Sequence, residues 1–205
     1  TLLYREPPHY ITLGKELPAK ALDEILTDHA EVFTELKEYY KQTSESDTTK
    51  ISFYEDTYSL YNLYRFAHYY EEAYGKYIWL KSGASLVIEH TEAMTVIDVN
   101  TGSVLKKKKQ EDTLFYQINR EAAKEIARQL RLRNISGIIM IDFINMKDTA
   151  QKEKLLSLLD SECKKDRVHC NVIDMTALNL VEMTRNKVRK PLHEQIRSCM
   201  KNNRS

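Results

Sequence analysis

Residues 91–102 read Thr91-Glu92-Ala93-Met94-Thr95-Val96-Ile97-Asp98-Val99-Asn100-Thr101-Gly102 and predict a short apolar strand that ends in an acid, an amide and a turn. A second apolar strand, Ile138-Ile139-Met140-Ile141-Asp142-Phe143, also carries an acid near its end. The residues between them have a helical pattern over 119–133, which completes a βαβ unit. If the two strands are parallel in one sheet, Asp98 and Asp142 meet at its carboxyl edge, where α/β folds usually keep their sites.

Two carboxylates at one sheet edge are suited to Mg²⁺, which binds one or two acids together with waters and phosphate oxygens, and Mn²⁺ is expected to substitute for it. Asn100 lies two residues past Asp98 and points the same way if the strand persists. Its neutral amide would orient a water or a phosphate oxygen. The competing interpretation is that strand-terminal acids cap loops. The metal interpretation predicts metal-dependent phosphate chemistry.

Charge is distributed unevenly along the chain. Residues 1–102 hold 9 Lys and Arg against 17 Asp and Glu, whereas residues 103–205 hold 22 against 13. The basic half favours a polyanionic partner such as nucleic acid. The expected phosphate contacts lie in the lysine run at 106–109 and on the polar face of the helix over 119–133; they are Lys106, Lys107, Lys124, Arg128 and Arg131. A solvated helix face and a disordered loop are the competing interpretations.

Strands and helices alternate after Gly75, which predicts a layered α/β domain behind a helix-rich segment. We expect further helices over 18–36, 58–74, 150–165 and 178–190, and further strands over 51–54, 77–80, 85–89 and 168–173. No stretch approaches the roughly 18 apolar residues of a membrane span. The cysteines, Cys163, Cys170 and Cys199, form no C-x-x-C pair. The sequence therefore predicts a reduced, cytoplasmic protein with no membrane partner.

Four blocks of the chain resemble, in the same order, the catalytic signature of the RNase E/G family of bacterial endoribonucleases. The blocks are VIEHTEAMTVIDVNTG (87–102), EAAKEIARQLRLRN (121–134), GIIMIDFI (137–144) and LVEMTR (180–185). The segment before Gly75 resembles the part of the family that precedes its catalytic subdomain. The resemblance implies a partial RNase H-like subdomain over 1–75, a DNase I-like catalytic subdomain over 76–197 and a basic tail over 198–205.

The same resemblance implies a single Mg²⁺ held by Asp98 and Asp142, with Asn100 holding the attacking water or the scissile phosphate. The implied reaction hydrolyses single-stranded RNA to 5′-phosphate and 3′-hydroxyl ends, in RNA processing and decay. The family's OB-fold RNA-binding domain would precede Thr1. The family also joins protomers through a C-x-x-C zinc link, but Cys199 is followed by Met200-Lys201-Asn202. We therefore expect no zinc link in this chain and leave a homo-oligomer without zinc open.

Two other functions stay open at this point. A catalytically weak RNA-binding or assembly module of the same family would bind RNA without metal-dependent turnover. The lysine run at 106–109 motivates it, because that run replaces the family's glycine-rich stretch after Asn100. A Mg²⁺-dependent phosphodiesterase that acts on other substrates would be distinguished by comparing RNA with DNA.

Overall fold

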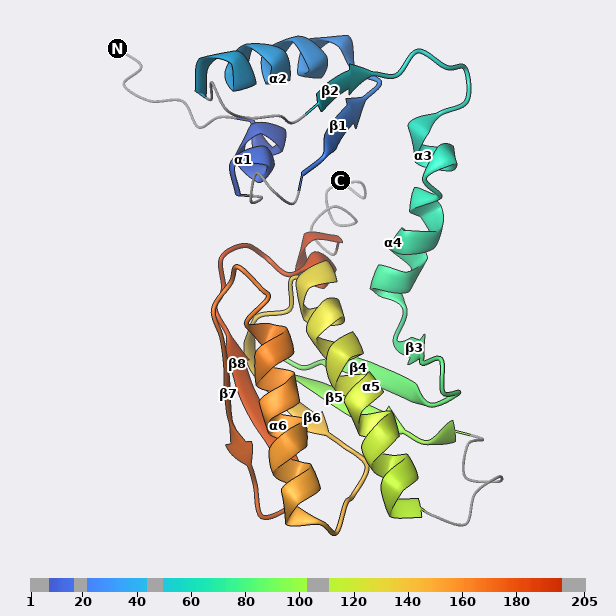
Figure 1. Ribbon diagram of the computed structural model, residues 1–205, viewed down its shortest axis with the longest axis vertical. Coiled ribbons are helices and arrows are strands. Elements are labelled where there is room, and N and C mark those ends of the chain that lie inside the picture. Colours follow the sequence, from blue (N-terminus) through green and yellow to red (C-terminus); the bar gives the residue numbers. More distant parts are fainter. Residues whose placement is uncertain (1–7, 17–21, 44–49, 103–110, 197–205) are drawn as a thin grey trace. The chain divides into compact units, whose positions relative to one another are not determined.

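The chain is described by a computed structural model that covers residues 8–16, 22–43, 50–102 and 111–196 (Figure 1). It divides into two compact units, unit 1 over residues 1–68 and unit 2 over residues 69–205. This division falls inside a helix, α4 (Phe66–Tyr74), whereas the boundary predicted from the sequence lies just after that helix, near Gly75. Within the described residues, no helix is both long and apolar enough to cross a membrane.

Unit 1 contains a two-stranded parallel ribbon with a helix packed on it. β1 (Glu24–Thr27) pairs with β2 (Lys50–Phe53), and α2 (Ala30–Thr43) contacts both strands. Phe33 of α2 meets Phe53 of β2 with the ring centroids 5.4 Å apart. The remaining helices of this part of the chain are α1 (His9–Glu16), α3 (Leu60–Leu63) and the beginning of α4.

Unit 2 is a mixed sheet of six strands with two long helices side by side on one of its faces (Figure 1). The strands lie in the order β3-β4-β5-β6-β8-β7; β5 and β6 are parallel, and each other neighbouring pair is antiparallel. The elements in chain order are β3 (Tyr77–Trp79), β4 (Ser85–His90), β5 (Met94–Asn100), α5 (Glu111–Leu132), β6 (Gly137–Asp142), α6 (Thr149–Cys163), β7 (Cys170–Met175) and β8 (Leu180–Arg185).

The core of unit 2 lies between the sheet and the two helices. Every second residue of the central strands is buried there, as the period of a strand requires. The strands contribute Leu86, Ile88, Ile97, Val99, Ile139, Ile141, Val181 and Met183, and the helices contribute Ile118, Ala122, Ile126, Leu130, Leu155 and Leu159. The α/β class predicted from the sequence is confirmed. β5, α5 and β6 form the predicted βαβ unit, and Asp98 and Asp142 lie on its paired strands.

Several predicted elements are wrong in type or extent. Residues 178–190 were expected to be helical, but β8 occupies 180–185, because Val181, Met183 and Arg185 are buried with period two between β6 and β7. The helix expected over 18–36 is replaced in part by β1. Its two apolar residues, Ile25 and Leu26, are compatible with a helix or a strand, and pairing with β2 makes this segment a strand. The helix expected over 58–74 is interrupted at Arg65, which has a φ of 53°.

Candidate functional site

The parallel pairing of β5 with β6 brings the two predicted acids together. In the register of this pair, Ile97 lies opposite Ile141 and Asp98 lies opposite Asp142. Directly paired residues on neighbouring strands are about 5 Å apart at the backbone. Both acids lie close to the carboxyl ends of their strands, with Asp142 the last residue of β6. The sheet edge predicted from the sequence therefore does bear the two carboxylates next to each other.

Strand alternation puts these side chains on the sheet face opposite α5 and α6. Thr95, Ile97 and Val99 are buried against the helices, whereas Asp98 is half-buried and Asn100 is exposed on the other side. Asp142 is likewise exposed, next to the buried Ile141. We call the side of the sheet that carries Asp98, Asn100 and Asp142 the outer face.

The three polar side chains interact electrostatically. The Nδ2 of Asn100 donates a hydrogen bond of 2.6 Å to Oδ2 of Asp98. Desolvation raises the pKa of the Asp142 carboxyl above its usual range, and the negative charge of Asp98 raises it further. The raised pKa therefore reflects first the poor solvation of the ionised Asp142 and second its repulsion by Asp98. A cation between the two carboxylates would relieve this repulsion.

The donor set fits a hard divalent cation. Asp98 and Asp142 offer carboxylate oxygens, the ligands that Mg²⁺ and Mn²⁺ prefer, and the exposed outer face leaves room for waters and for phosphate oxygens. Among the described residues there is no group of three or more His, Cys, Asp or Glu side chains with metal-binding geometry. Structural zinc sites usually need four such ligands, whereas two acids are enough for Mg²⁺. Cys199 of the expected zinc-link position lies outside the described residues.

Of the predicted RNA-binding residues, those that the structure describes are not brought together with the acids. Lys106 and Lys107 lie outside the described residues. Lys124, Arg128 and Arg131 are on α5, which covers the inner face of the sheet, so the acids and this basic stripe lie on opposite sides of unit 2. Their role in RNA binding remains a prediction.

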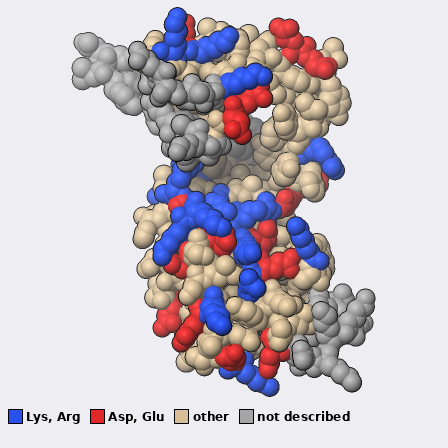
Figure 2. Space-filling view, in the orientation of Figure 1, with Lys and Arg blue, Asp and Glu red and all other residues tan. Residues whose placement is uncertain are grey.

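The basic stripe on α5 is also partly neutralised. Arg128 forms ion pairs with Glu72 of α4 and, at 2.9 Å, with Glu125 one turn earlier. Arg131 donates to the backbone carbonyl of Glu162 at 3.4 Å. Figure 2 shows basic side chains of unit 2 gathered over the C-terminal ends of α5 and α6, with acidic side chains among them. Because Arg128 is engaged in ion pairs, the exposed Lys124 is more available than Arg128 for contact with a bound anion.

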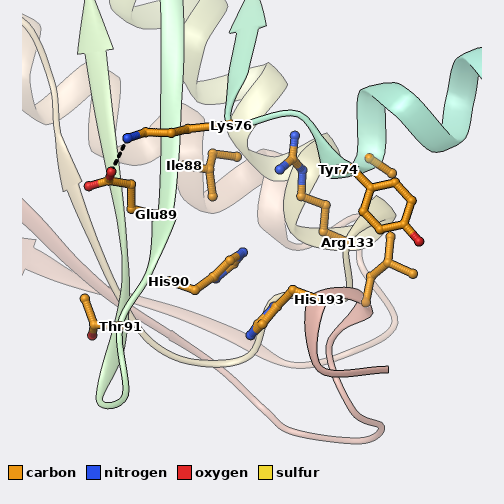
Figure 3. A pocket seen from close by; sticks show the side chains of 10 residues that line it. Tyr74, Lys76, Ile88, Glu89, His90, Thr91, Arg133 and His193 are labelled. Atoms are coloured by element: carbon orange, nitrogen blue, oxygen red, sulfur yellow. Dashed lines mark ion pairs between the residues drawn. The ribbon is translucent and has the colours of Figure 1, made fainter. Parts of the chain in front are cut away.

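A pocket of about 440 Å³ lies near the start of β5, whereas Asp98 lies near the end of that strand (Figure 3). Neither Asp98 nor Asp142 lines the pocket. His90 of β4 stacks on His193 with the ring centroids 3.8 Å apart, and its Nδ1 lies 3.0 Å from Oγ1 of Thr95 at the start of β5. Burial lowers the pKa of the neighbouring Arg133 to about 10. Arg133 donates to Oε1 of Gln129 and to the backbone carbonyl of Glu72. The bond to Glu72 joins the end of α5 to α4, which is a structural role.

Comparison with known proteins adds independent information. The model of the Ribonuclease E/G family matches residues 1–188. Ribonuclease G of Haemophilus influenzae is 37% identical over 190 residues, which are 93% of this chain and 38% of the relative. Ribonuclease G of Escherichia coli (strain K12) is 38% identical over 171 residues, 83% of this chain and 35% of the relative. Ribonuclease E of Nostoc sp. is 32% identical over 196 residues, 94% of this chain and 28% of the relative. The chain thus spans about a third of the length of these relatives.

Proposed function

Because the chain belongs to the Ribonuclease E/G family, we propose that unit 2 carries the active site of a Mg²⁺-dependent endoribonuclease that hydrolyses single-stranded RNA. The observation that supports this most directly is the register of β5 and β6, which pairs Asp98 with Asp142. The bond from Asn100 to Asp98 adds a third polar group on the same face. RNA processing and decay in the cytoplasm is the proposed setting, and the free thiols of Cys163 and Cys170 are in keeping with a reducing compartment.

In the proposed mechanism, Asp98 and Asp142 would hold one Mg²⁺ through their carboxylate oxygens. The bound ion would polarise the scissile phosphate and lower the pKa of a water. Both carboxylates must be ionised to hold it, and desolvation together with the charge of Asp98 raises the pKa of Asp142, so a bound cation would favour its ionised form. In this proposal the role of Asp98 and Asp142 is to hold the ion.

Asn100 supplies orientation. Its Nδ2 is used in the bond to Asp98, which fixes the amide plane and leaves Oδ1 to accept a hydrogen bond from the attacking water. The oxygen of that water would attack phosphorus while the bond from phosphorus to the 3′ oxygen breaks. The attacking water releases one proton to solvent and the 3′ oxygen takes one up from solvent, so the products carry 5′-phosphate and 3′-hydroxyl ends. Salt-sensitive contacts from Lys106 and Lys107 to the RNA backbone are part of the proposal.

Cleavage of an unstructured RNA by the full chain, with Mg²⁺ present, tests this function. Asp98→Asn and Asp142→Asn should each lower the cleavage rate about 100-fold or more, because a metal ion supplies several kcal/mol of transition-state stabilisation and each 1.4 kcal/mol is worth tenfold. Glu153→Gln removes an exposed carboxylate on α6 and is the matched control. Undiminished cleavage by either Asp variant would contradict the assignment.

The catalytically weak binding module predicts a different outcome of the same experiment. It gives salt-dependent RNA binding by the wild-type chain and no cleavage that depends on Mg²⁺ or on the two acids. The lysine run at 106–109, in place of the family's glycine-rich stretch, is what keeps this second candidate in view. Measuring binding and cleavage on one RNA separates the two candidates.

A further inference from the structure

Two exposed aromatic side chains stand on β3, an edge strand of the unit 2 sheet. Tyr77 is 60% exposed and Trp79 is 73% exposed, whereas Ile78 between them is 6% exposed. This alternation points Ile78 into the core and the two rings to the outer face of the sheet. Large aromatic side chains seldom remain so exposed without a partner, because each removes a large apolar area from water when it is covered.

The register of the sheet aligns these rings with the proposed catalytic groups. Tyr77 pairs with Val87 of β4, Val87 pairs with Asp98, and Asp98 pairs with Asp142, so all four form one row across the outer face. Trp79 is in the same way two strands from Asn100, through Ser85. Two strand spacings are about 10 Å. A nucleotide that neighbours the one held at the acids can therefore reach the rings.

The surroundings of the rings suit a nucleic-acid strand. Between the rings and the acids, the floor of the outer face is made by the small or half-buried side chains of Ser85 and Val87, which present no bulky obstacle. Nζ of Lys76 lies 5.8 Å from the centre of the Tyr77 ring, but the ion pair with Glu89 partly neutralises this charge, so the rings provide most of the contact. Single-stranded nucleic acids are commonly held by aromatic rings that stack on bases, next to positive charge.

We propose that Tyr77 and Trp79 form a base-stacking subsite that holds RNA next to the scissile phosphate. The subsite rests on the proposed function for its position on the substrate, but base stacking itself needs no metal and no catalysis. The rings stack on the flat face that every base has. The subsite therefore contributes affinity and positioning with little sequence specificity. Tyr77 and Trp79 are positioning residues because they do not touch the reacting atoms.

Trp79 is the only tryptophan of the chain, so its fluorescence reports directly on this subsite. Unstructured oligouridine and oligoadenosine are titrated into the full chain in EDTA, and the tryptophan emission is followed. Stacking predicts saturable quenching of the tryptophan emission. Loss of one stacked base at Tyr77 should weaken the apparent affinity of Tyr77→Ala for RNA about tenfold. Ile173→Ala is the matched control, because Ile173 is 55% exposed on β7 at the other edge of the sheet. It should leave the affinity unchanged.

Trp79→Ala is tested by the anisotropy of a labelled RNA and by cleavage, in which a positioning role raises KM more than it lowers kcat. Asp98→Asn should still show the quenching. Quenching combined with cleavage that does not need the acids would refute the proposed function and leave the subsite standing. The subsite alone would be overturned if cleavage depends on the acids but RNA causes no quenching, and if Tyr77→Ala and Trp79→Ala bind and cleave RNA like the wild type. An emission shift that depends on protein concentration without RNA would also overturn it, since a second copy would then cover the rings.

Discussion

The repulsion between Asp98 and Asp142 predicts that removing either charge stabilises the metal-free chain. Two unit charges about 5 Å apart repel by about 0.8 kcal/mol in water, and salt reduces this further at an exposed face. Asp142→Asn also removes the free-energy cost of partly burying a charged carboxylate, the same desolvation that raises the pKa of Asp142. We expect it to raise the free energy of unfolding by about 0.5–1 kcal/mol, which is roughly 1–4 °C in Tm for a chain of this size. Asp98→Asn should give the lower part of this range.

Thermal unfolding in EDTA and in MgCl₂ measures both halves of the prediction. In EDTA the two Asn variants should unfold above the wild type, and the control Glu153→Gln should unfold with it. In Mg²⁺ the order should reverse, because a ligand at ten times its Kd adds about 1.4 kcal/mol to the chain that binds it. Asn variants that are less stable than the wild type in EDTA, or that gain as much from Mg²⁺, would refute the reasoning.

The pH dependence has a definite sign. The pKa of Asp142 is raised in the folded chain, so the folded state takes up the proton more readily than the unfolded state does. Ionised Asp142 therefore costs stability above its folded pKa, and the cost disappears as the pH falls through that pKa. The advantage of Asp142→Asn in EDTA should be largest at neutral pH and should shrink on acidification. An advantage that grows on acidification would show that the charge pair is not its cause.

Other positions make predictions about folding alone. Gly102→Ala should cost about 1–3 kcal/mol in urea unfolding, because Gly102 has a φ of +56° and its added Cβ would lie 2.7 Å from the carbonyl oxygen of Gly83. Arg185→Met should cost about 3–5 kcal/mol, because it leaves the carboxylate of Asp166, 2.9 Å from Nε, buried without its partner, and a wild-type midpoint would exclude that role. Leu159→Ala should cost about 2–5 kcal/mol by leaving a cavity under α6, and a change below 1 kcal/mol would mean that the site is not packed as described.

The parts of the fold that the sequence predicts well are those with one dominant period. Residues 94–100 and 137–142 are apolar runs that end in an acid, and the helix between them has a single apolar stripe, so their types and their parallel pairing follow. Residues 178–190 are different, because their apolar residues fit a helix and a strand almost equally well. Pairing with β6 and β7 decides for a strand, and β6 lies far away in the chain, before α6.

The candidate site was predictable in its centre and not in its surroundings. The meeting of Asp98 with Asp142 follows from the βαβ unit. The separation of Lys124 from the acids was also accessible: Asp98 lies between the buried Ile97 and Val99, so it points away from the helix that covers them. The alternation in Tyr77-Ile78-Trp79 carried a similar signal. Its place beside the acids, however, depends on the pairing of β3 with β4 and of β4 with β5.

The location of the site follows from helices covering one face of a sheet. Along β5 every residue that faces α5 and α6 is buried, so polar groups for chemistry have to stand on the outer face. Partial burial on that face, together with the charge of Asp98, raises the pKa of Asp142. The same rows continue to the rings of β3. A strand of RNA that runs across β3, β4, β5 and β6 would therefore meet stacking surface first and the acid pair next, whereas RNA bound to α5 would meet neither.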